Sequence, residues 1–384
     1  MELISGITPF RVAVSDAEIA DLRERLGRTR WPDQLPDSGW DYGADLDYVR
    51  SLCEYWRDGF DWRAFEARFN AFPQYVGEAD GQRLHFYHLR SPEPEARPLI
   101  ISHGWPGSVA EFLEVLGPLS DPAAHGGDPA DAFHVVAPSL PGFGFSGPTR
   151  ARGYRGRDIA GAFDGLMRTL GYDTYFAQGG DWGTLITMLL AGNFPERVKA
   201  IQLNLVTAPP PNPADPTEGL DAEELEGLAR TQAFMTHESA YQQIQGTKPQ
   251  SLAYGLTDSP AGLAAWITEK FRSWSDCGGD VERSFSRDRL LDNISVYWLT
   301  GTINASMRLY YEETGPGRRE ALPDIRVPTG HARFPAEIIQ TPRRWAEAKY
   351  NITRWQKMPR GGHFAAMEVP DLFVDEVRTF FRYR

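Results

Sequence analysis

Cysteine is scarce in this sequence, because Cys53 and Cys277 are the only two among 384 residues. Neither lies in a CxxC or Cys/His spacing, which argues against a disulfide scaffold and a structural zinc site. Long apolar runs are also missing: the best, 98–101 and 187–192, are far shorter than the roughly 18 residues of a membrane-spanning helix. The first thirty residues carry many charged side chains and do not have the form of a signal peptide. These absences predict a cytoplasmic protein without a membrane partner.

Basic residues are outnumbered, with 40 Lys and Arg against 52 Asp and Glu, for a formal net charge of −12. Proteins that bind nucleic acid need a positive surface to displace counterions from phosphates, so we expect no nucleic-acid partner. Apolar residues make up 41% of the chain and charged residues 24%, the balance of a globular protein with a core. We therefore expect an enzyme that acts on a small molecule without a cofactor or metal.

The first part of the chain, residues 1–95, is predicted to be largely helical. Ser15 to Glu18 has the form of a capping box, and apolar residues follow it at helical spacing. Residues 46–56 form a second amphipathic segment. Because aromatic residues are dense between and after these segments, we expect this extension to pack onto a larger body, either its own chain or a neighbour.

After residue 95 the pattern of apolar residues changes and predicts short buried strands that alternate with helices. This alternation predicts an α/β fold with a doubly wound, mostly parallel sheet. A helical stretch without such strands interrupts the series and is predicted to be a lid over the carboxyl ends of the strands, where these sheets bind ligands. The predicted strands are 98–102, 133–137, 175–178, 198–206, 325–334 and 353–358, and the predicted helices are 159–170, 185–191 and 372–381. The expected units are the extension (1–95), the first core part (96–207), the lid (208–320) and the second core part (321–384).

The segment 179–183, Gly-Gly-Asp-Trp-Gly, follows a predicted strand and precedes a predicted helix. Small residues on both sides of a central one are typical of a nucleophile elbow, a tight and strained turn. Asp181 stands at its tip, and a carboxylate can attack carbon directly to form an ester. The alternative is an ordinary helix N-cap, which Asp also favours. The strand–turn–helix frame favours the nucleophile.

Two further glycine-rich segments fit a hydrolytic site. His103-Gly-Trp-Pro-Gly follows a predicted strand, and its turn would aim the amide of Trp105, together with that of Trp182, at an oxyanion. His363 lies among glycines before the last helix, where a hydrolytic base is expected. His103 itself is expected to be structural.

The acid that orients the base should follow a strand. Glu337 meets this condition and is favoured, whereas Asp324 lies at the wrong end of the same strand. The other usual position of this acid is after the predicted strand 198–206, where the sequence offers only Asn204.

The segment 142–147 matches GxGxxG, but the acidic residues downstream fall in or beside a helix. We therefore expect an active-site loop rather than a nucleotide site.

In combination, these motifs resemble the microsomal-type epoxide hydrolases of the α/β-hydrolase fold, including their N-terminal extension. The resemblance covers nearly the whole chain and is carried by the segments 30–32, 60–63, 103–108, 178–183, 334–337 and 360–366. It implies a nucleophile at Asp181, a base at His363 and an acid at Glu337. It also implies two lid tyrosines that hold the epoxide oxygen: the segment 238–249 points to Tyr241, and 300–308 leads to Tyr310, with Tyr311 as the alternative register.

The resemblance implies hydrolysis of a small-molecule epoxide by water to a vicinal diol through an aspartyl ester. The sequence is also similar to bacterial members that act in natural-product pathways, notably enediyne antibiotic biosynthesis. Aromatic residues of the lid point to a bulky aromatic or polyketide-type epoxide, or else form the lid core: Trp266, Phe271, Trp274, Tyr297 and Trp298. The alternatives are a haloalkane dehalogenase, in which the Trp105 and Trp182 indoles would bind halide, and a non-catalytic ligand receptor. A homodimer is left open.

Overall fold

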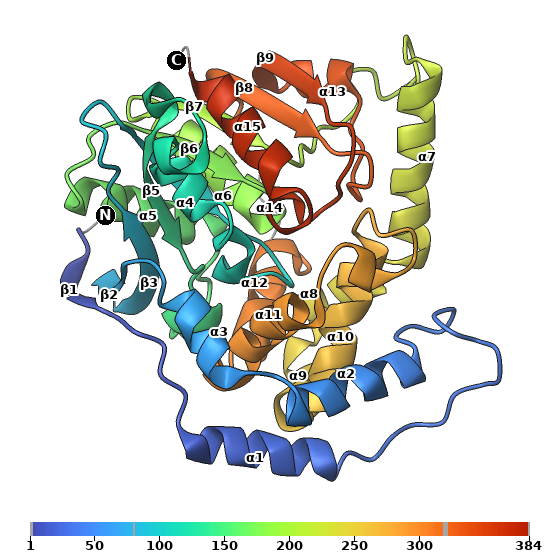
Figure 1. Ribbon diagram of the computed structural model, residues 1–384. Helices are drawn as coiled ribbons and strands as arrows, with labels where there is room; N and C mark the ends of the chain where they lie inside the picture. The colour runs from blue at the N-terminus through green and yellow to red at the C-terminus, as the bar shows by residue number, and fades with distance from the viewer. Residues whose placement is uncertain (1–2, 80, 318–321, 383–384) are drawn as a thin grey trace.

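The computed structural model describes residues 3–79, 81–317 and 322–382. One sheet of nine strands runs through these residues in the order β1-β2-β3-β5-β4-β6-β7-β8-β9 (Figure 1). The pairs from β1 to β5 are antiparallel, and every neighbouring pair from β5 to β9 is parallel, which confirms the predicted fold class. The strands are β1 (Ser5–Pro9), β2 (Gln74–Ala79), β3 (Gln82–Leu89), β4 (Arg97–Ser102), β5 (Phe133–Pro138), β6 (Tyr175–Gly179), β7 (Val198–Leu203), β8 (Ile325–Arg333) and β9 (Tyr350–Lys357).

Helices surround the sheet and account for most of the remaining described chain. α5 packs against α6, and α4 against α15. Among the described residues, none of the helices combines the length and the apolar character needed to cross a membrane. The α-helices are α1 (Asp16–Gly27), α2 (Leu46–Asp58), α3 (Trp62–Phe69), α4 (Leu116–Ser120), α5 (Gly156–Thr169), α6 (Trp182–Asn193), α7 (Ala222–His237), α8 (Ala240–Thr247), α9 (Pro249–Asp258), α10 (Pro260–Ser273), α11 (Arg287–Thr300), α12 (Ile303–Thr314), α13 (Arg343–Glu347), α14 (Ala365–Glu368) and α15 (Pro370–Phe381).

The N-terminal extension is less helical than its sequence predicts. The capping box at Ser15 is present at the start of α1, and α2 begins at Leu46 as expected. However, β1, β2 and β3 all lie within the first 95 residues and extend the sheet by three strands. The expectation of a largely helical extension is therefore wrong in this part. The strand predicted over 198–206 is also shorter, because β7 ends at Leu203.

The helical insertion predicted between two strands of the core is present as α7 to α12, between β7 and β8. Its helices are tied to loops at the carboxyl ends of the core strands. Tyr297 donates its hydroxyl hydrogen to the Gly107 carbonyl at 2.6 Å, and Thr302 Oγ1 accepts from the Gly144 amide at 3.0 Å. The GxGxxG segment thus joins the core to the lid.

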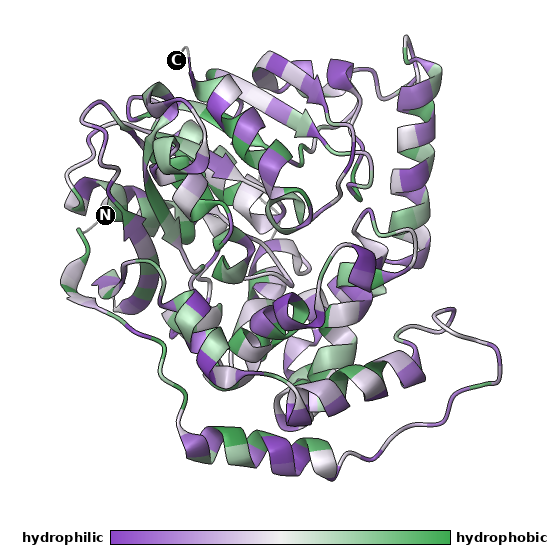
Figure 2. Ribbon diagram, in the orientation of Figure 1, coloured by the Kyte–Doolittle hydropathy of each residue, from purple (hydrophilic) through white to green (hydrophobic). Residues whose placement is uncertain are grey.

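The N-terminal helices pack against the lid of the same chain (Figure 1). The Trp56 indole of α2 donates to Ser295 Oγ at 3.1 Å, and Arg68 of α3 forms two hydrogen bonds with Asp292 of α11, at 2.7 and 2.6 Å. Figure 2 shows green and purple stripes along α1, the pattern of a helix with one buried face. The N-terminal extension therefore contacts the lid helices directly and helps to hold the lid in place.

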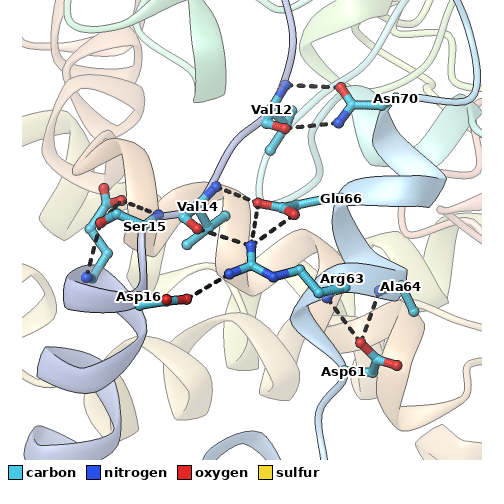
Figure 3. A network of polar contacts seen from close by, with 10 residues as sticks. Val12, Val14, Ser15, Asp16, Asp61, Arg63, Ala64, Glu66 and Asn70 are labelled. Carbon is cyan, nitrogen blue, oxygen red and sulfur yellow. Dashed lines mark hydrogen bonds and ion pairs between the residues drawn. The ribbon is translucent and has the colours of Figure 1, made fainter.

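The extended segment before α1 is fastened to α3 by a polar network (Figure 3). Asn70 hydrogen-bonds both backbone groups of Val12, accepting at 2.9 Å and donating at 2.8 Å. Arg63 donates to the Val14 carbonyl at 3.1 Å and to Asp16 at 2.7 Å. These contacts fix the direction in which the chain leaves the sheet toward the lid.

Candidate active site

Asp181 lies in the sharp turn between β6 and α6. Its backbone has φ 54° and ψ −126°, a left-handed conformation that is unfavourable for a residue with a side chain. The turn closes only around glycines: a Cβ on Gly179 would lie 2.2 Å from the Gly183 carbonyl oxygen, and one on Gly183 would lie 1.9 Å from the Ser102 carbonyl oxygen. Asp181 precedes α6, but its side chain makes no capping hydrogen bond. The N-cap alternative is thereby disfavoured.

The turn after β4 carries a backbone donor to this carboxylate. The Trp105 amide donates to Oδ1 of Asp181 at 2.8 Å. A Cβ on Gly104 would lie 2.3 Å from Asp181, so this approach requires glycine. Trp182 is the first residue of α6, and the amide of a first helical residue has no carbonyl partner within its helix. The two predicted oxyanion donors therefore flank Asp181.

His103 supports this turn from within the core. Its Nε2 accepts from the Leu140 amide at 3.1 Å, so its Nδ1 carries the hydrogen and donates to the Gly104 carbonyl at 3.0 Å. Burial lowers the pKa of His103 to about 4, which keeps the ring neutral. These bonds fit the structural role expected for His103.

His363 and Glu337 meet Asp181 as the sequence predicts. The imidazole Nδ1 lies 2.7 Å from Oε1 of Glu337, and Nε2 lies 3.3 Å from Oδ2 of Asp181. Glu337 follows β8, and its Oε1 also accepts from the Ile338 amide at 2.7 Å. Asp324 immediately precedes β8, at the opposite end of the strand, so the geometry favours Glu337 as the partner of His363.

Opposing effects act on the His363 ring. Burial by itself would lower the pKa of His363, but the nearby carboxylates of Glu337 and Asp181 raise it well above its ordinary value. The imidazole therefore favours its protonated form as long as both carboxylates are charged. Any chemistry that removes the charge of Asp181 would weaken this hold.

Tyr241 of α8 and Tyr310 of α12 lie across from the carboxylate. The ring of Tyr241 stacks on the Trp105 indole at 5.1 Å, and the ring of Tyr310 meets the Trp182 indole edge-on at 4.7 Å. The centroids of the two phenol rings are 5.9 Å apart. The sequence points to Tyr310 with Tyr311 as the alternative register, and the structure brings Tyr310 into the aromatic cluster.

Both phenols are held in their protonated form. Burial is the largest cause that raises the pKa of Tyr241 and of Tyr310, and the charge of Asp181 raises both further. Gln242 donates from Nε2 to the Tyr241 hydroxyl oxygen at 2.9 Å, which leaves the hydroxyl hydrogen free to point elsewhere. Sequence reasoning missed Gln242, although it adjoins Tyr241 in the matched segment.

These side chains border one cavity of about 250 Å³. Asp181, Tyr241 and Tyr310 all line it, whereas Tyr311 is half-buried and is not in its lining. The rest of the wall is mostly apolar and includes Leu185, Met188, Leu205, Phe234, Ile338 and Ile339. An apolar cavity with a few convergent polar groups is the usual form of a small-molecule site.

The lid aromatics singled out in the sequence do not line this cavity. Phe271, Trp274 and Tyr297 are almost completely buried in the core, and Trp266 and Trp298 pack against it. Their burial favours the alternative that these residues form the lid core, and Trp274 in addition packs against His363 and Tyr241.

Comparison with known proteins agrees with this geometry. The family described as Epoxide hydrolase N terminus matches residues 7–112, and the alpha/beta hydrolase fold matches residues 97–251. A Stigmatella aurantiaca protein provisionally named as an epoxide hydrolase is 47% identical over 378 residues, covering 98% of this chain and 85% of its own. Epoxide hydrolase 1 of Sus scrofa is 38% identical over 403 residues, covering 98% of this chain and 88% of its own.

Solved structures give the same result in three dimensions. An epoxide hydrolase from Aspergillus niger superposes with a TM-score of 0.88 at 34% identity, over 98% of this chain and 96% of that one. The juvenile hormone epoxide hydrolase of the silkworm Bombyx mori superposes with a TM-score of 0.84 at 30% identity, over 98% and 93% of the two chains. With the extension, the elbow and the lid all matched, this chain belongs to the microsomal-type epoxide hydrolase family of the α/β-hydrolase fold.

Proposed function

We propose that this protein hydrolyses an epoxide to a vicinal diol through a covalent ester on Asp181. The observation that carries the proposal is the position of the Asp181 carboxylate between two kinds of group. On one side His363 lies 3.3 Å from its Oδ2, and on the other the phenols of Tyr241 and Tyr310 share its cavity. This arrangement separates the acids that a leaving alkoxide needs from the base that an ester needs.

In the first step Asp181 attacks an epoxide carbon, and the carbon–oxygen bond of the ring breaks. A tyrosine hydroxyl gives its proton to the departing oxygen while the second tyrosine hydrogen-bonds to it. In the next step His363, oriented by Glu337, takes a proton from water, and the resulting hydroxide attacks the Asp181 carbonyl carbon. The Trp105 and Trp182 amides stabilise the oxyanion. The bond from this carbon to the substrate oxygen then breaks, that oxygen takes the proton held by His363, and the diol leaves. The second water proton, left on the Asp181 carboxyl, returns to the tyrosinate, so that the carboxylate and the phenol re-form.

The cavity supports an apolar epoxide as the substrate. Its wall carries aliphatic side chains, and a neighbouring space of about 580 Å³ shares Met235, Gln242 and Thr314 with it. A substrate with an apolar body could therefore extend from Asp181 toward the lid helices α7 and α8. A role in natural-product biosynthesis stays a prediction from the sequence.

Heavy-oxygen water distinguishes the ester route from direct attack of water on the epoxide. In a single turnover with excess enzyme, styrene oxide and labelled water, we expect the label in the Asp181 carboxylate and not in the first diol formed. Peptide mass mapping of the enzyme and mass analysis of the diol measure both. Label found in the first diol, with none on Asp181, would contradict the ester.

A change at Glu337 should move the acid limb of the pH profile. Hydrolysis of the ester needs His363 in its neutral form. In the ester, Asp181 no longer contributes a charge. We therefore expect kcat to rise as the pH passes through the pKa that His363 has in the ester form. Glu337 is the strongest group raising this pKa, so Glu337→Gln should lower it and shift the acid limb of kcat to lower pH. The maximum kcat should also fall, by about tenfold or more, because the ring loses its charged partner. An acid limb that stays in place would count against this coupling.

A further inference from the structure

Asp181 lies between two spaces of different character. Besides the apolar cavity, it lines a second, much smaller void of about 10 Å³, and Asp181 is the one residue common to the described linings of both. A volume of this size is about that needed to hold one water molecule. His363 also lines the small void, whereas neither Tyr241 nor Tyr310 does. The carboxylate therefore has a substrate-sized space on one side and a water-sized space on the other.

The wall of the small void carries polar atoms that lack partners. Ser102 Oγ and Gln178 Oε1 are both buried and make no hydrogen bond with any described residue. Leaving a buried polar atom unpaired costs about 1–3 kcal/mol, so groups of this kind usually bond to an internal water. The void thus has the polar partners as well as the volume for one water molecule.

Glu111 brings a carboxyl group to the same void. It lies in the short 3-10 helix Val109–Phe112 that follows the Trp105 turn, and part of the residue reaches the surface while the carboxyl lies in the interior. A Cβ on Gly107 would lie 1.6 Å from its Oε1, so the glycine makes room for this carboxyl. The Gly104 amide is close enough to this carboxyl to act against the rise of its pKa.

The carboxyl of Glu111 is suited to hold a water molecule rather than to compete with Asp181. Burial, assisted by the charge of Asp181, raises the pKa of Glu111 to about 8, although His363 and the Gly104 amide act in the opposite direction. At neutral pH the group is therefore mostly uncharged. A neutral carboxyl can both donate and accept a hydrogen bond.

We propose that the small void holds the water molecule that hydrolyses the Asp181 ester, and that Glu111 is the residue that positions this water for His363. The inference rests on the proposed ester route. The water oxygen forms a bond to the Asp181 carbonyl carbon while His363 Nε2 takes the water proton. The bond between this carbon and the substrate oxygen then breaks, and the departing alkoxide takes that proton from His363. The second water proton, left on the Asp181 carboxyl, returns to the tyrosine that protonated the epoxide oxygen. Glu111 keeps its own proton throughout.

The test is to measure ester formation and ester hydrolysis separately in Glu111→Met. Rapid quenching with intact-mass analysis, with styrene oxide as substrate, follows the ester through one turnover. We expect ester formation within about twofold of the wild-type rate and ester hydrolysis slower by about 10- to 100-fold, the range for losing a hydrogen bond to a reacting group. Glu111→Gln keeps a donor and an acceptor and should restore hydrolysis to within a few-fold.

A control variant and a second test variant separate the proposed role of Glu111 from a general effect on the fold. Glu114→Met is the matched control, because Glu114 is close in sequence but faces Arg289 at 3.1 Å; both of its rates should stay at the wild-type level. Ser102→Ala removes a hydroxyl without a bonded partner, so it should fold normally and slow hydrolysis alone, by a few-fold. Unchanged hydrolysis in both Glu111→Met and Ser102→Ala, or equal losses in both steps, would overturn the proposal. Failure of the wild type to form any ester would instead refute the proposed function.

Discussion

Replacing His363 with glutamine should stop the reaction at the covalent ester, so that the protein gains the mass of one substrate molecule on Asp181. A carboxylate needs no base to attack an epoxide, and Tyr241 and Tyr310 remain in place to protonate the leaving oxygen. Hydrolysis, in contrast, loses its base, and the loss of a general base typically costs about 10²- to 10⁴-fold in rate. Intact mass after mixing with styrene oxide, followed by peptide mapping, measures the adduct.

Suitable controls separate this outcome from nonspecific alkylation. His237→Gln changes an exposed histidine of α7 and should turn over without accumulating an adduct. The double variant His363→Gln with Asp181→Asn should form no adduct, because an amide is a poor nucleophile. An adduct mapped to another residue, or diol formation by His363→Gln at the wild-type rate, would refute the assigned roles.

The core of the site could be predicted because its signals are local. The elbow at Asp181 and the turn at Trp105 both depend on glycines at positions where a Cβ would collide with backbone or with Asp181, and such spacings are visible in the sequence. The strands that carry them are short apolar runs buried on both faces. Their order along the chain then brings Asp181 and His363 to the same edge of the sheet.

Features that depend on packing between distant segments were not predictable in this way. β3 is not predicted because it buries polar residues such as His85 and His88, so no apolar alternation marks it. The choice between Tyr310 and Tyr311 depends on which face α12 turns toward the cavity. Nothing in the sequence marks Glu111 as interior, and its carboxyl has room there because Gly107 lacks a side chain.

The double variant Tyr241→Phe with Tyr310→Phe should lose ester formation while keeping a folded site. An alkoxide leaving group is strongly basic, so opening the ring at neutral pH requires a proton donor at the epoxide oxygen. Burial raises the pKa of both phenols, which keeps the proton available. We expect each single variant to lose about 10- to 100-fold in ester formation, and the double variant about 10³-fold or more, equivalent to roughly 4 kcal/mol of transition-state stabilisation.

Tyr311→Phe is the matched control, because it removes the same hydroxyl from the neighbouring residue, which is not in the cavity lining. It should form the ester at the wild-type rate, measured by the same quenched mass analysis. If the Tyr241 and Tyr310 variants kept full turnover, the epoxide chemistry would be wrong. The buried indole N–H groups of Trp105 and Trp182 would then favour a leaving halide, because a halide needs hydrogen-bond donors but no proton. Halide release from a chloroalkane decides between these two chemistries, since both begin with attack by Asp181 but only one depends on the phenols.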